Sequence, residues 1–379
     1  MIQLVWKTII ISLCFLLVLG SKNVFSQVCS DVYATALTKN LYHNLFQLKD
    51  TYTLFGHQDD LAYGVGWKYE KGRSDIKSVV QDYPALYGWD LAHLELDSAK
   101  NIDGVPFENM KSYIKDAYRR GGVVTISWHA SNPLTEKSAW DITEGSLHSI
   151  LPGNLKHEKY KTWLDKVAVF IQQLKTDQGA PIPILFRPFH ELTGNWFWWG
   201  KNVSSSADFK AIWKFTVDYL QKEKNIHQLL YVYNTADFDS NADFLARYPG
   251  DDQVDILSFD KYQYEQNKGR ENFIVSMEAQ LGILTEVAKS KNKICAIAET
   301  GYEAVQDKTW WTNTLYPLIV KYPIAYVLVW RNQGYMATSK KMHYYAPYPG
   351  QISSADFKKF YQLPKVVFQN KLTTFHIYQ

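Results

Sequence analysis

Cysteine is scarce in this chain of 379 residues, which holds only Cys14, Cys29 and Cys295. Two of the three remain if the N-terminal segment is removed as a leader, and two cysteines cannot build a disulfide framework. Cys295 lies in an apolar, strand-like run, so we expect it to be a buried thiol. The sequence therefore excludes a fold that depends on disulfide bonds.

Strong charge of one sign is also absent. The formal net charge is +3, and the loss of Lys7 and Lys22 with residues 1–26 lowers it to +1. A nearly neutral chain argues against nucleic acid or an anionic membrane as the partner. No linker rich in Ser, Pro or Gly divides the chain, so we expect a single catalytic domain over residues 27–379.

A hydrophobic run long enough to span a membrane is missing too. The apolar stretch from Ile9 to Gly20 covers about 12 residues, whereas a spanning helix needs roughly 20. The stretch follows Lys7 and precedes small residues near Ser26, which is typical of a secretory signal peptide. We therefore predict that residues 1–26 are a signal peptide, that the protein is periplasmic or secreted, and that it has no membrane span.

Aromatic residues, by contrast, are abundant. They make up 15% of the chain, with 13 Trp and 26 Tyr, which leaves a surplus beyond the needs of a core. Four of them follow one another at Trp196, Phe197, Trp198 and Trp199. One strand or helix face cannot bury all four, so we expect some of them to line a cleft. Flat rings of this kind stack on the apolar face of a sugar.

Eight short apolar runs alternate with amphipathic helical stretches. Such alternation predicts a parallel sheet, and eight repeats predict an α/β fold that closes into a single (β/α)8 TIM barrel. The predicted strands are Thr53 to Gly56, Ala85 to Trp89, Val123 to Trp128, Ile182 to Phe186, Leu229 to Tyr233, Val254 to Phe259, Ile294 to Ala298 and Ile324 to Trp330.

Each predicted strand ends in residues able to bind or react, and in a barrel all these ends lie on the C-terminal rim, where active sites are built. We therefore expect the catalytic cleft at this rim. The stretch from Ala130 to His157 lacks clear periodicity, so we interpret it as a long loop that forms one wall of the cleft.

Two carboxylates stand out at the rim. Glu191 follows the fourth predicted strand and Glu299 follows the seventh, on the opposite side of the barrel mouth. Opposed carboxylates are what glycoside hydrolysis needs: a separation of roughly 5 to 5.5 Å gives retention of configuration, and about 6.5 to 9.5 Å gives inversion. Both outcomes stay open from the residues alone, and the placement on opposite strands favours retention.

The surroundings suggest a role for each carboxylate. Glu191 lies among aromatic residues beside His190, and the resulting desolvation favours its protonated form, which suits a general acid. Glu299 should stay ionised in order to attack, with Tyr262 and Arg331 as hydrogen-bond donors. The alternative interpretation makes Glu191 a structural ion-pair partner of Arg187.

A zinc site is the other interpretation of this segment. His190-Glu191 opens an H-E-x-x-H motif, but Gly194 stands where the second histidine would be. The metal site would lack a ligand, so we expect neither a metal nor a cofactor.

The chain resembles glycoside hydrolase family 26, a clan A family whose members include β-mannanases. The resemblance spans nearly the whole chain after the leader. It is carried by Arg187 to Glu191 with Gly194 and residues 196–199, by Phe55 to Gln58, Ser127 to His129, Ser258 to Tyr262, Ala298 to Gly301, and by Trp330-Arg331.

The resemblance implies a retaining barrel enzyme with Glu191 as acid/base and Glu299 as nucleophile. Many clan A families place Asn directly before the acid, where it contacts the 2-hydroxyl of the sugar, whereas this family has His, here His190. That difference suits mannose, whose 2-hydroxyl is axial. The other substrate-binding positions that the resemblance implies are Trp196, Tyr262, His129, Trp330 and Arg331.

We therefore expect a mannan endo-1,4-β-mannosidase that acts on β-mannan, galactomannan or manno-oligosaccharides as a monomer. No carbohydrate-binding module is identified at either end, which suggests soluble or short substrates. The same family also contains enzymes for β-1,3-1,4-glucans and β-1,3-xylans. From another class, a catalytically inactive carbohydrate-binding barrel would bind sugars without turnover.

A lipid anchor on Cys29 is the alternative to a freely exported protein. Val28 precedes this cysteine, and a residue of that size disfavours acylation. Mass spectrometry of the mature protein should find an unlipidated N-terminus near Gln27. An acylated Cys29 would overturn this expectation.

Overall fold

The computed structural model describes residues 29–265 and 268–379. The predicted leader, residues 1–26, lies outside the described residues. The eight barrel strands are β1 (Thr53–Gln58), β4 (Leu86–Asp90), β5 (Val123–Ser127), β6 (Ile184–Arg187), β7 (Leu229–Thr235), β8 (Ile256–Gln263), β9 (Ile294–Tyr302) and β10 (Tyr326–Val329).

These strands form a closed parallel barrel. Each pairs in parallel with the next in chain order, and β10 pairs with β1 to close the ring. Every observed strand overlaps the apolar run predicted for it, so the (β/α)8 prediction is confirmed. A ninth strand, β13 (Val366–Val367), pairs in parallel with the first two residues of β1.

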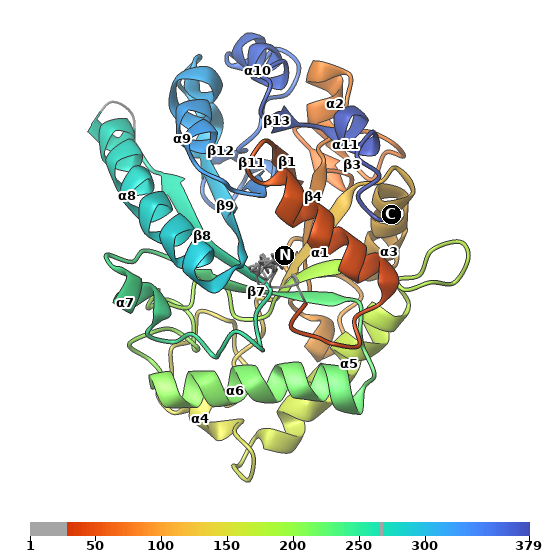
Figure 1. The fold of residues 1–379 in the computed structure, drawn as a ribbon, viewed down its shortest axis with the longest axis vertical. Coiled ribbons are helices and arrows are strands. Elements are labelled where there is room, and N and C mark those ends of the chain that lie inside the picture. The colour runs from red at the N-terminus through yellow and green to blue at the C-terminus, as the bar shows by residue number, and fades with distance from the viewer. Residues whose placement is uncertain (1–28, 266–267) are drawn as a thin grey trace, which may run out of the picture.

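Helices surround the strands, as Figure 1 shows. They are α1 (Ala36–Leu48), α2 (Asp75–Val80), α3 (Phe107–Arg119), α4 (Ser146–Ser149), α5 (His157–Gln172), α6 (Ser206–Asp218), α7 (Asn241–Leu245), α8 (Lys268–Lys291), α9 (Tyr316–Lys321), α10 (Ser354–Tyr361) and α11 (Gln369–Thr373). Ser205 caps α6, because its hydroxyl accepts a hydrogen bond from the Asp208 backbone N–H. In the described residues, no helix combines the length and the apolar character needed to cross a membrane.

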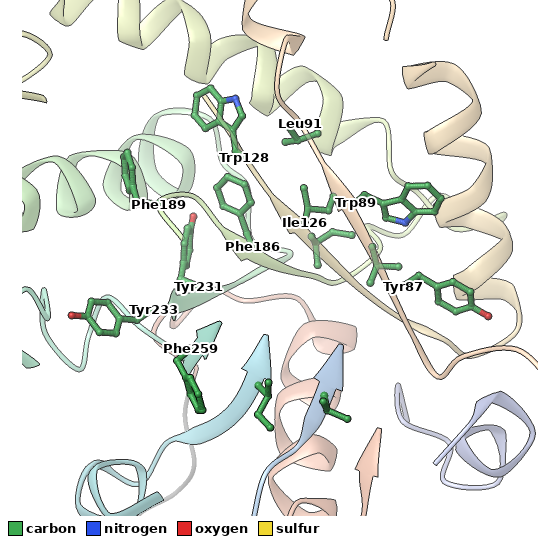
Figure 2. Packing of buried hydrophobic residues seen from close by; sticks show 14 of the residues in the cluster. Tyr87, Trp89, Leu91, Ile126, Trp128, Phe186, Phe189, Tyr231, Tyr233 and Phe259 are labelled. Carbon is green, nitrogen blue, oxygen red and sulfur yellow. The ribbon is translucent and has the colours of Figure 1, made fainter. Parts of the chain in front are cut away.

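The outward faces of the strands pack against the helices. Large side chains such as Tyr87, Trp89, Phe186 and Tyr231 are fully buried there (Figure 2). They occupy alternate positions along their strands, which is why each strand shows a period of two. Their neighbours in sequence point into the barrel.

The inside of the barrel forms a second apolar cluster. Leu54, Leu185, Val232 and Ile256 belong to it, together with residues of α1. Helix α1 lies across one end of the barrel in Figure 1. Its residues Leu41, Tyr42 and Leu45 are buried in the cluster. The barrel is therefore closed at the end away from the carboxyl ends of the strands.

Strand β9 contains one residue more than its neighbours can pair. Phe259 pairs with Ile297 and Asp260 pairs with Glu299, so that Ala298 is left over. The pairing with β10 shifts at the same place. A bulge of this kind changes the direction of the side chains that follow it.

The loops at the carboxyl ends of the strands build the walls of the mouth. Two short hairpins lie in them, β2 (Tyr63–Gly64) with β3 (Trp67–Lys68), and β11 (Gly334–Met336) with β12 (Lys341–His343). The stretch predicted as a long loop, Ala130 to His157, is irregular apart from the single turn of α4 and the start of α5 at His157.

Candidate active site

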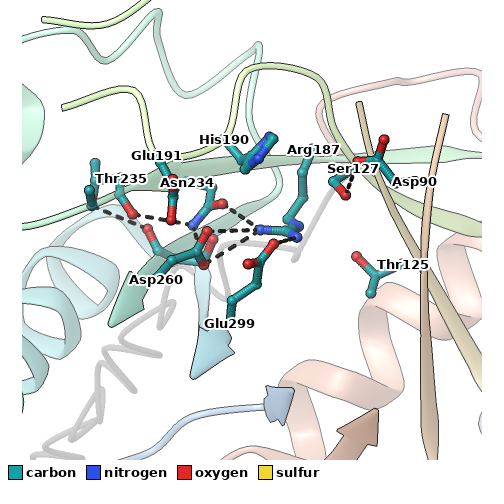
Figure 3. Close-up of polar contacts among 12 residues, drawn as sticks. Asp90, Thr125, Ser127, Arg187, His190, Glu191, Asn234, Thr235, Asp260 and Glu299 are labelled. Carbon is teal, nitrogen blue, oxygen red and sulfur yellow. Dashed lines mark hydrogen bonds and ion pairs between the residues drawn. The ribbon is translucent and has the colours of Figure 1, made fainter. Parts of the chain in front are cut away.

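The site is built around Arg187, the last residue of β6. Its guanidinium is fully buried and reaches three acceptors on three other strands (Figure 3). Nη1 donates to Asn234 Oδ1 at 2.5 Å and lies 3.2 Å from Asp260 Oδ2, and Nη2 donates to Glu299 Oε1. This one cation therefore holds the inward-facing ends of β7, β8 and β9 together.

Glu299 is almost completely buried on β9, with 4% of its surface exposed. Its Oε1 accepts from Arg187, and its Oε2 accepts from the Tyr262 hydroxyl at 2.8 Å. Burial, followed by the Glu299 charge, raises the pKa of Tyr262 well above its usual range. The phenol therefore stays protonated and donates. Both oxygens of Glu299 thus have the partners that an ionised carboxylate needs.

Glu191 stands four residues after the end of β6 in a left-handed conformation, with φ of 52°. This region is uncommon for a side chain of this size. Its Oε2 accepts from Trp196 Nε1 at 2.6 Å. Burial, and then the nearby Glu299 charge, raise the pKa of Glu191 to about 7, against the opposing effects of Trp196, His129 and Arg187. Glu191 therefore takes up a proton far more readily than an ordinary glutamate.

The two glutamates face each other. Carboxylate oxygens of Glu191, Asp260 and Glu299 all lie within 4.8 Å of one another. Three close acids could in principle hold a metal ion, and they are the one such group among residues 29–265 and 268–379. Here Arg187 already supplies the positive charge to Glu299 and Asp260, and Glu191 binds a proton near neutral pH. One cation and one proton leave one negative charge among the three acids, and the raised pKa of Asp260 favours a second proton there.

Asp260 and Asn234 support Arg187 and were missed as site residues in the sequence. Asn234 Nδ2 donates to Asp260 Oδ1 at 3.0 Å. Burial, and then the Glu299 charge, raise the pKa of Asp260 well above its usual range, although Arg187 opposes this. The signal that could have found both residues is their position: each is a polar residue at an inward-facing place near the carboxyl end of a strand.

The alternative interpretation of Glu191 as the ion-pair partner of Arg187 is wrong. Arg187 pairs with Glu299 and Asp260 instead. The expectation that Arg331 donates to Glu299 is also wrong, because the Arg331 guanidinium forms an ion pair with Asp103. Arg331 lies 5.7 Å from the centre of the Trp330 ring, so these two predicted positions are neighbours.

His129 and His190 form a direct pair. Their Nε2 atoms lie 3.0 Å apart, and the two ring planes are nearly perpendicular. Burial, and then the charges of His129 and Arg187, lower the pKa of His190 well below its usual range. His190 is therefore a neutral imidazole beside the acid/base candidate. The structure brings both predicted histidines to the same part of the site.

Only one of the four consecutive aromatic residues lies open to solvent. Trp196 is 44% exposed, whereas Phe197, Trp198 and Trp199 are buried. Trp196 lines a cavity of about 470 Å³ together with Glu191, Asp260, Tyr262 and Tyr264. The expectation that some of the four line a cleft is therefore confirmed for Trp196, and its indole presents a flat surface next to the acid.

The arrangement places a carboxyl group that can donate a proton close to a second carboxylate. Glu191 carries a proton near neutral pH, and Glu299 has two donors for its negative charge. When the surroundings of two neighbouring carboxyl groups give them different pKa values, one group can act as an acid while the other stays ionised. An aromatic face beside them suits a sugar.

Comparison with known proteins gives consistent matches. A model of glycosyl hydrolase family 26 matches residues 30–321. The chain is 31% identical over 360 residues to a mannan endo-1,4-β-mannosidase of Bifidobacterium adolescentis, which covers 90% of this chain and 35% of that protein. It is 28% identical to a mannan endo-1,4-β-mannosidase of Bacillus subtilis strain 168, over 70% of this chain and 71% of that one.

A solved structure is similar over nearly its full length. It is a family 26 β-mannanase from Bacteroides ovatus, with a TM-score of 0.86 and 45% identity, and the match covers 91% of this chain and 98% of that one. The chain spans about a third of the Bifidobacterium protein, by contrast.

The hydrogen bond from Trp196 to Glu191 should affect the pKa of Glu191. Trp196→Phe removes a donor that stabilises the Glu191 carboxylate, so the pKa of Glu191 should rise above about 7, by up to about one unit. Titration of 13C-labelled glutamate side chains by NMR measures it. Trp140→Phe, which keeps a ring against His129, should leave the titration unchanged. A lower pKa in Trp196→Phe would contradict the assignment.

Proposed function

The chain belongs to glycosyl hydrolase family 26, and on this basis we propose that it is a retaining β-1,4-mannanase with Glu191 as acid/base and Glu299 as nucleophile. The observation that carries the proposal is the pair of facing carboxylates, whose oxygens lie within 4.8 Å of each other and whose partners differ. The substrate would be β-mannan, galactomannan or manno-oligosaccharide, in keeping with the names of the relatives from Bifidobacterium and Bacillus.

In the first step, Glu191 donates its proton to the glycosidic oxygen while Glu299 attacks the anomeric carbon. Glu191 is suited to this because burial and the Glu299 charge raise its pKa to about 7. Glu299 is suited to attack because Arg187 and Tyr262 hold its two oxygens in place. The leaving sugar would stack on the exposed ring of Trp196.

In the second step, water hydrolyses the glycosyl-enzyme ester. Glu299 is now uncharged, so one of the two main causes of the raised pKa of Glu191 is gone. Glu191, which lost its proton in the first step, therefore has a greater tendency to remain ionised and to act as the base that activates the water. The same pair of residues thus supports both halves of the reaction.

Retention of configuration is supported by the separation of the carboxylates. Oxygen atoms within 4.8 Å of each other agree better with the roughly 5 to 5.5 Å of retaining glycosidases than with the 6.5 Å or more that leaves room for a water.

The preference for mannose rests on the family resemblance and on His190. A neutral His190, paired with His129 at 3.0 Å, stands where related families place an asparagine against the 2-hydroxyl. We propose that the histidine pair contacts the sugar on the non-reducing side of the cleaved bond. Trp330 and Arg331 would extend that contact.

We also propose that the protein is exported and acts as an unanchored monomer in the periplasm or outside the cell. The Cys29 side chain is buried in the cluster that contains Leu41 and Tyr42. A lipid on its sulfur would have to leave that position.

Two glutamate variants test the roles of the carboxylates. Glu191→Ala should lose roughly 10² to 10⁴-fold activity on mannan while retaining much of its activity on aryl mannosides, whose leaving groups need no proton. Glu299→Ala should lose activity on both. Glu303→Gln, which changes a carboxylate paired with Lys341 and His343 at the rim, is the control and should remain active. Full activity of Glu299→Ala would exclude it as the nucleophile.

A substrate panel separates the candidate activities. Linear mannan and galactomannan should be cleaved faster than β-1,3-1,4-glucan and β-1,3-xylan, and NMR of the first products should show the β anomer. Preferential cleavage of either other polymer would replace mannan as the substrate, and an initial α anomer would replace retention by inversion. Sugar binding without any turnover would indicate the carbohydrate-binding barrel instead.

A further inference from the structure

We propose that Asp90 is a positioning residue that holds His129 as the hydrogen-bond donor of the His129–His190 pair and thereby keeps a positive charge beside Glu191 and Glu299. The hydrogen-bond arrangement does not depend on the proposed function. Its effect on catalysis rests on the proposed function of the two glutamates.

Asp90 is the last residue of β4 and is completely buried. Its Oδ1 accepts from the backbone N–H groups of Ala92 at 2.8 Å and His129 at 3.3 Å. Its Oδ2 accepts from the Ser127 hydroxyl at 2.6 Å and lies 2.7 Å from His129 Nδ1 (Figure 3 shows the Ser127 contact). Three donors of fixed position therefore orient the carboxylate toward the Nδ1 edge of the His129 ring.

The contact with Asp90 fixes the proton on His129 Nδ1. A carboxylate with four partners accepts hydrogen bonds, so Nδ1 must carry a hydrogen. Trp140 stacks on the face of the His129 ring, with the ring centroids 5.3 Å apart and an angle of 20° between the planes. His129 Nε2 then points at His190, and the remaining question is which of the two Nε2 atoms carries the proton.

His190 is the poorer site for a positive charge. Both histidine rings lie against aromatic side chains, but the Arg187 cation acts on His190. His129 faces Asp90, and the charges of Glu299 and Glu191 also act on it. The extra proton therefore resides on His129, whose Nε2–H donates to His190 Nε2.

The electrostatics agree with this direction. Burial opposes a charge on His129, but the charge and hydrogen bond of Asp90, together with the charges of Glu299 and Glu191, raise the pKa of His129. Burial also acts to raise the pKa of Asp90, yet the charge and hydrogen bond of His129 lower it below its usual range. The pKa of His190 is lowered by burial and by the charges of His129 and Arg187. Asp90 is therefore the anion, His129 the cation and His190 the neutral hydrogen-bond acceptor.

The cation matters for the two glutamates because it opposes protonation of Glu191. His129 is among the charges that act most strongly on Glu191, and it acts to lower the pKa of that residue. Without the cation, Glu191 would hold its proton to a higher pH. Asp90 thus affects the acid/base without touching it.

Asp90→Asn is the discriminating variant. The backbone donors at Ala92 and His129 require an oxygen at the Oδ1 position, so the amide NH₂ must take the Oδ2 position and face His129 Nδ1. His129 then becomes a neutral ring that accepts at Nδ1 and donates at Nε2. NMR of 15N-labelled histidine, with the His129 signals assigned by their loss in His129→Gln, reads out both nitrogens.

In the native protein both His129 nitrogens should be protonated at pH 6, and in Asp90→Asn the Nδ1 should be unprotonated. Ser127→Ala removes one donor but keeps the carboxylate, and it should preserve the native pattern. A native His129 with an unprotonated Nε2, or an Asp90→Asn variant in which both nitrogens stay protonated, would overturn the proposal. These outcomes do not depend on whether the protein cleaves mannan.

Activity gives a second readout. On manno-oligosaccharides, the alkaline limb of the kcat/KM profile should move to higher pH in Asp90→Asn by roughly half a unit to one unit. Asp255→Asn is the matched control, because Asp255 is a fully buried carboxylate that accepts from Tyr231 N and Ser30 N at the other end of the barrel. Whatever its effect on stability, Asp255→Asn should leave the alkaline limb in place. An unmoved limb in Asp90→Asn, or an equal shift in Asp255→Asn, would refute the link to Glu191.

Discussion

One guanidinium placed among three carboxylates is the constraint on which the site depends. Arg187 is buried and pairs with Glu299 and Asp260, while Glu191 lies close to both. A single buried cation cannot neutralise three carboxylates, of which Asp260 and Glu299 are buried and Glu191 is partly exposed, and isolated buried charges are costly. Protons must supply the remainder, which is why the pKa values of Glu191 and Asp260 are raised. The reactivity of the site is thus a consequence of its charge balance.

The barrel delivers these groups through two different devices. Arg187, Asn234 and Asp260 face inward by the plain alternation of their strands, since their neighbours Phe186, Tyr233 and Phe259 pack outward. Glu299 does not follow this rule. Cys295 and Ile297 point outward and Ala298 points inward, so regular alternation would turn Glu299 toward the helices. The bulge at Ala298 turns it into the barrel instead.

The sequence was sufficient for the features that depend on local pattern. The eight strands follow from alternation and apolar runs, and Glu191 and Glu299 follow from their positions at strand ends. The pairing of Arg187 with Glu299, the bulge at Ala298 and the ion pair of Arg331 with Asp103 were not predicted. Each of them depends on how separate strands and loops are placed relative to one another. The sequence of one segment alone does not show that placement. The sequence left open which of residues 196–199 are buried, and Trp198 donates hydrogen bonds to Ala130 and Ala139 in a loop far from it along the chain.

The apolar plug that α1 forms with the inner faces of the strands leaves the barrel with a single mouth. Nothing as large as a sugar can pass along the barrel axis, since Leu54, Leu185 and Val232 fill it. Under the proposed function, the substrate would therefore reach Glu191 and Glu299, and both products would leave them, through this one opening.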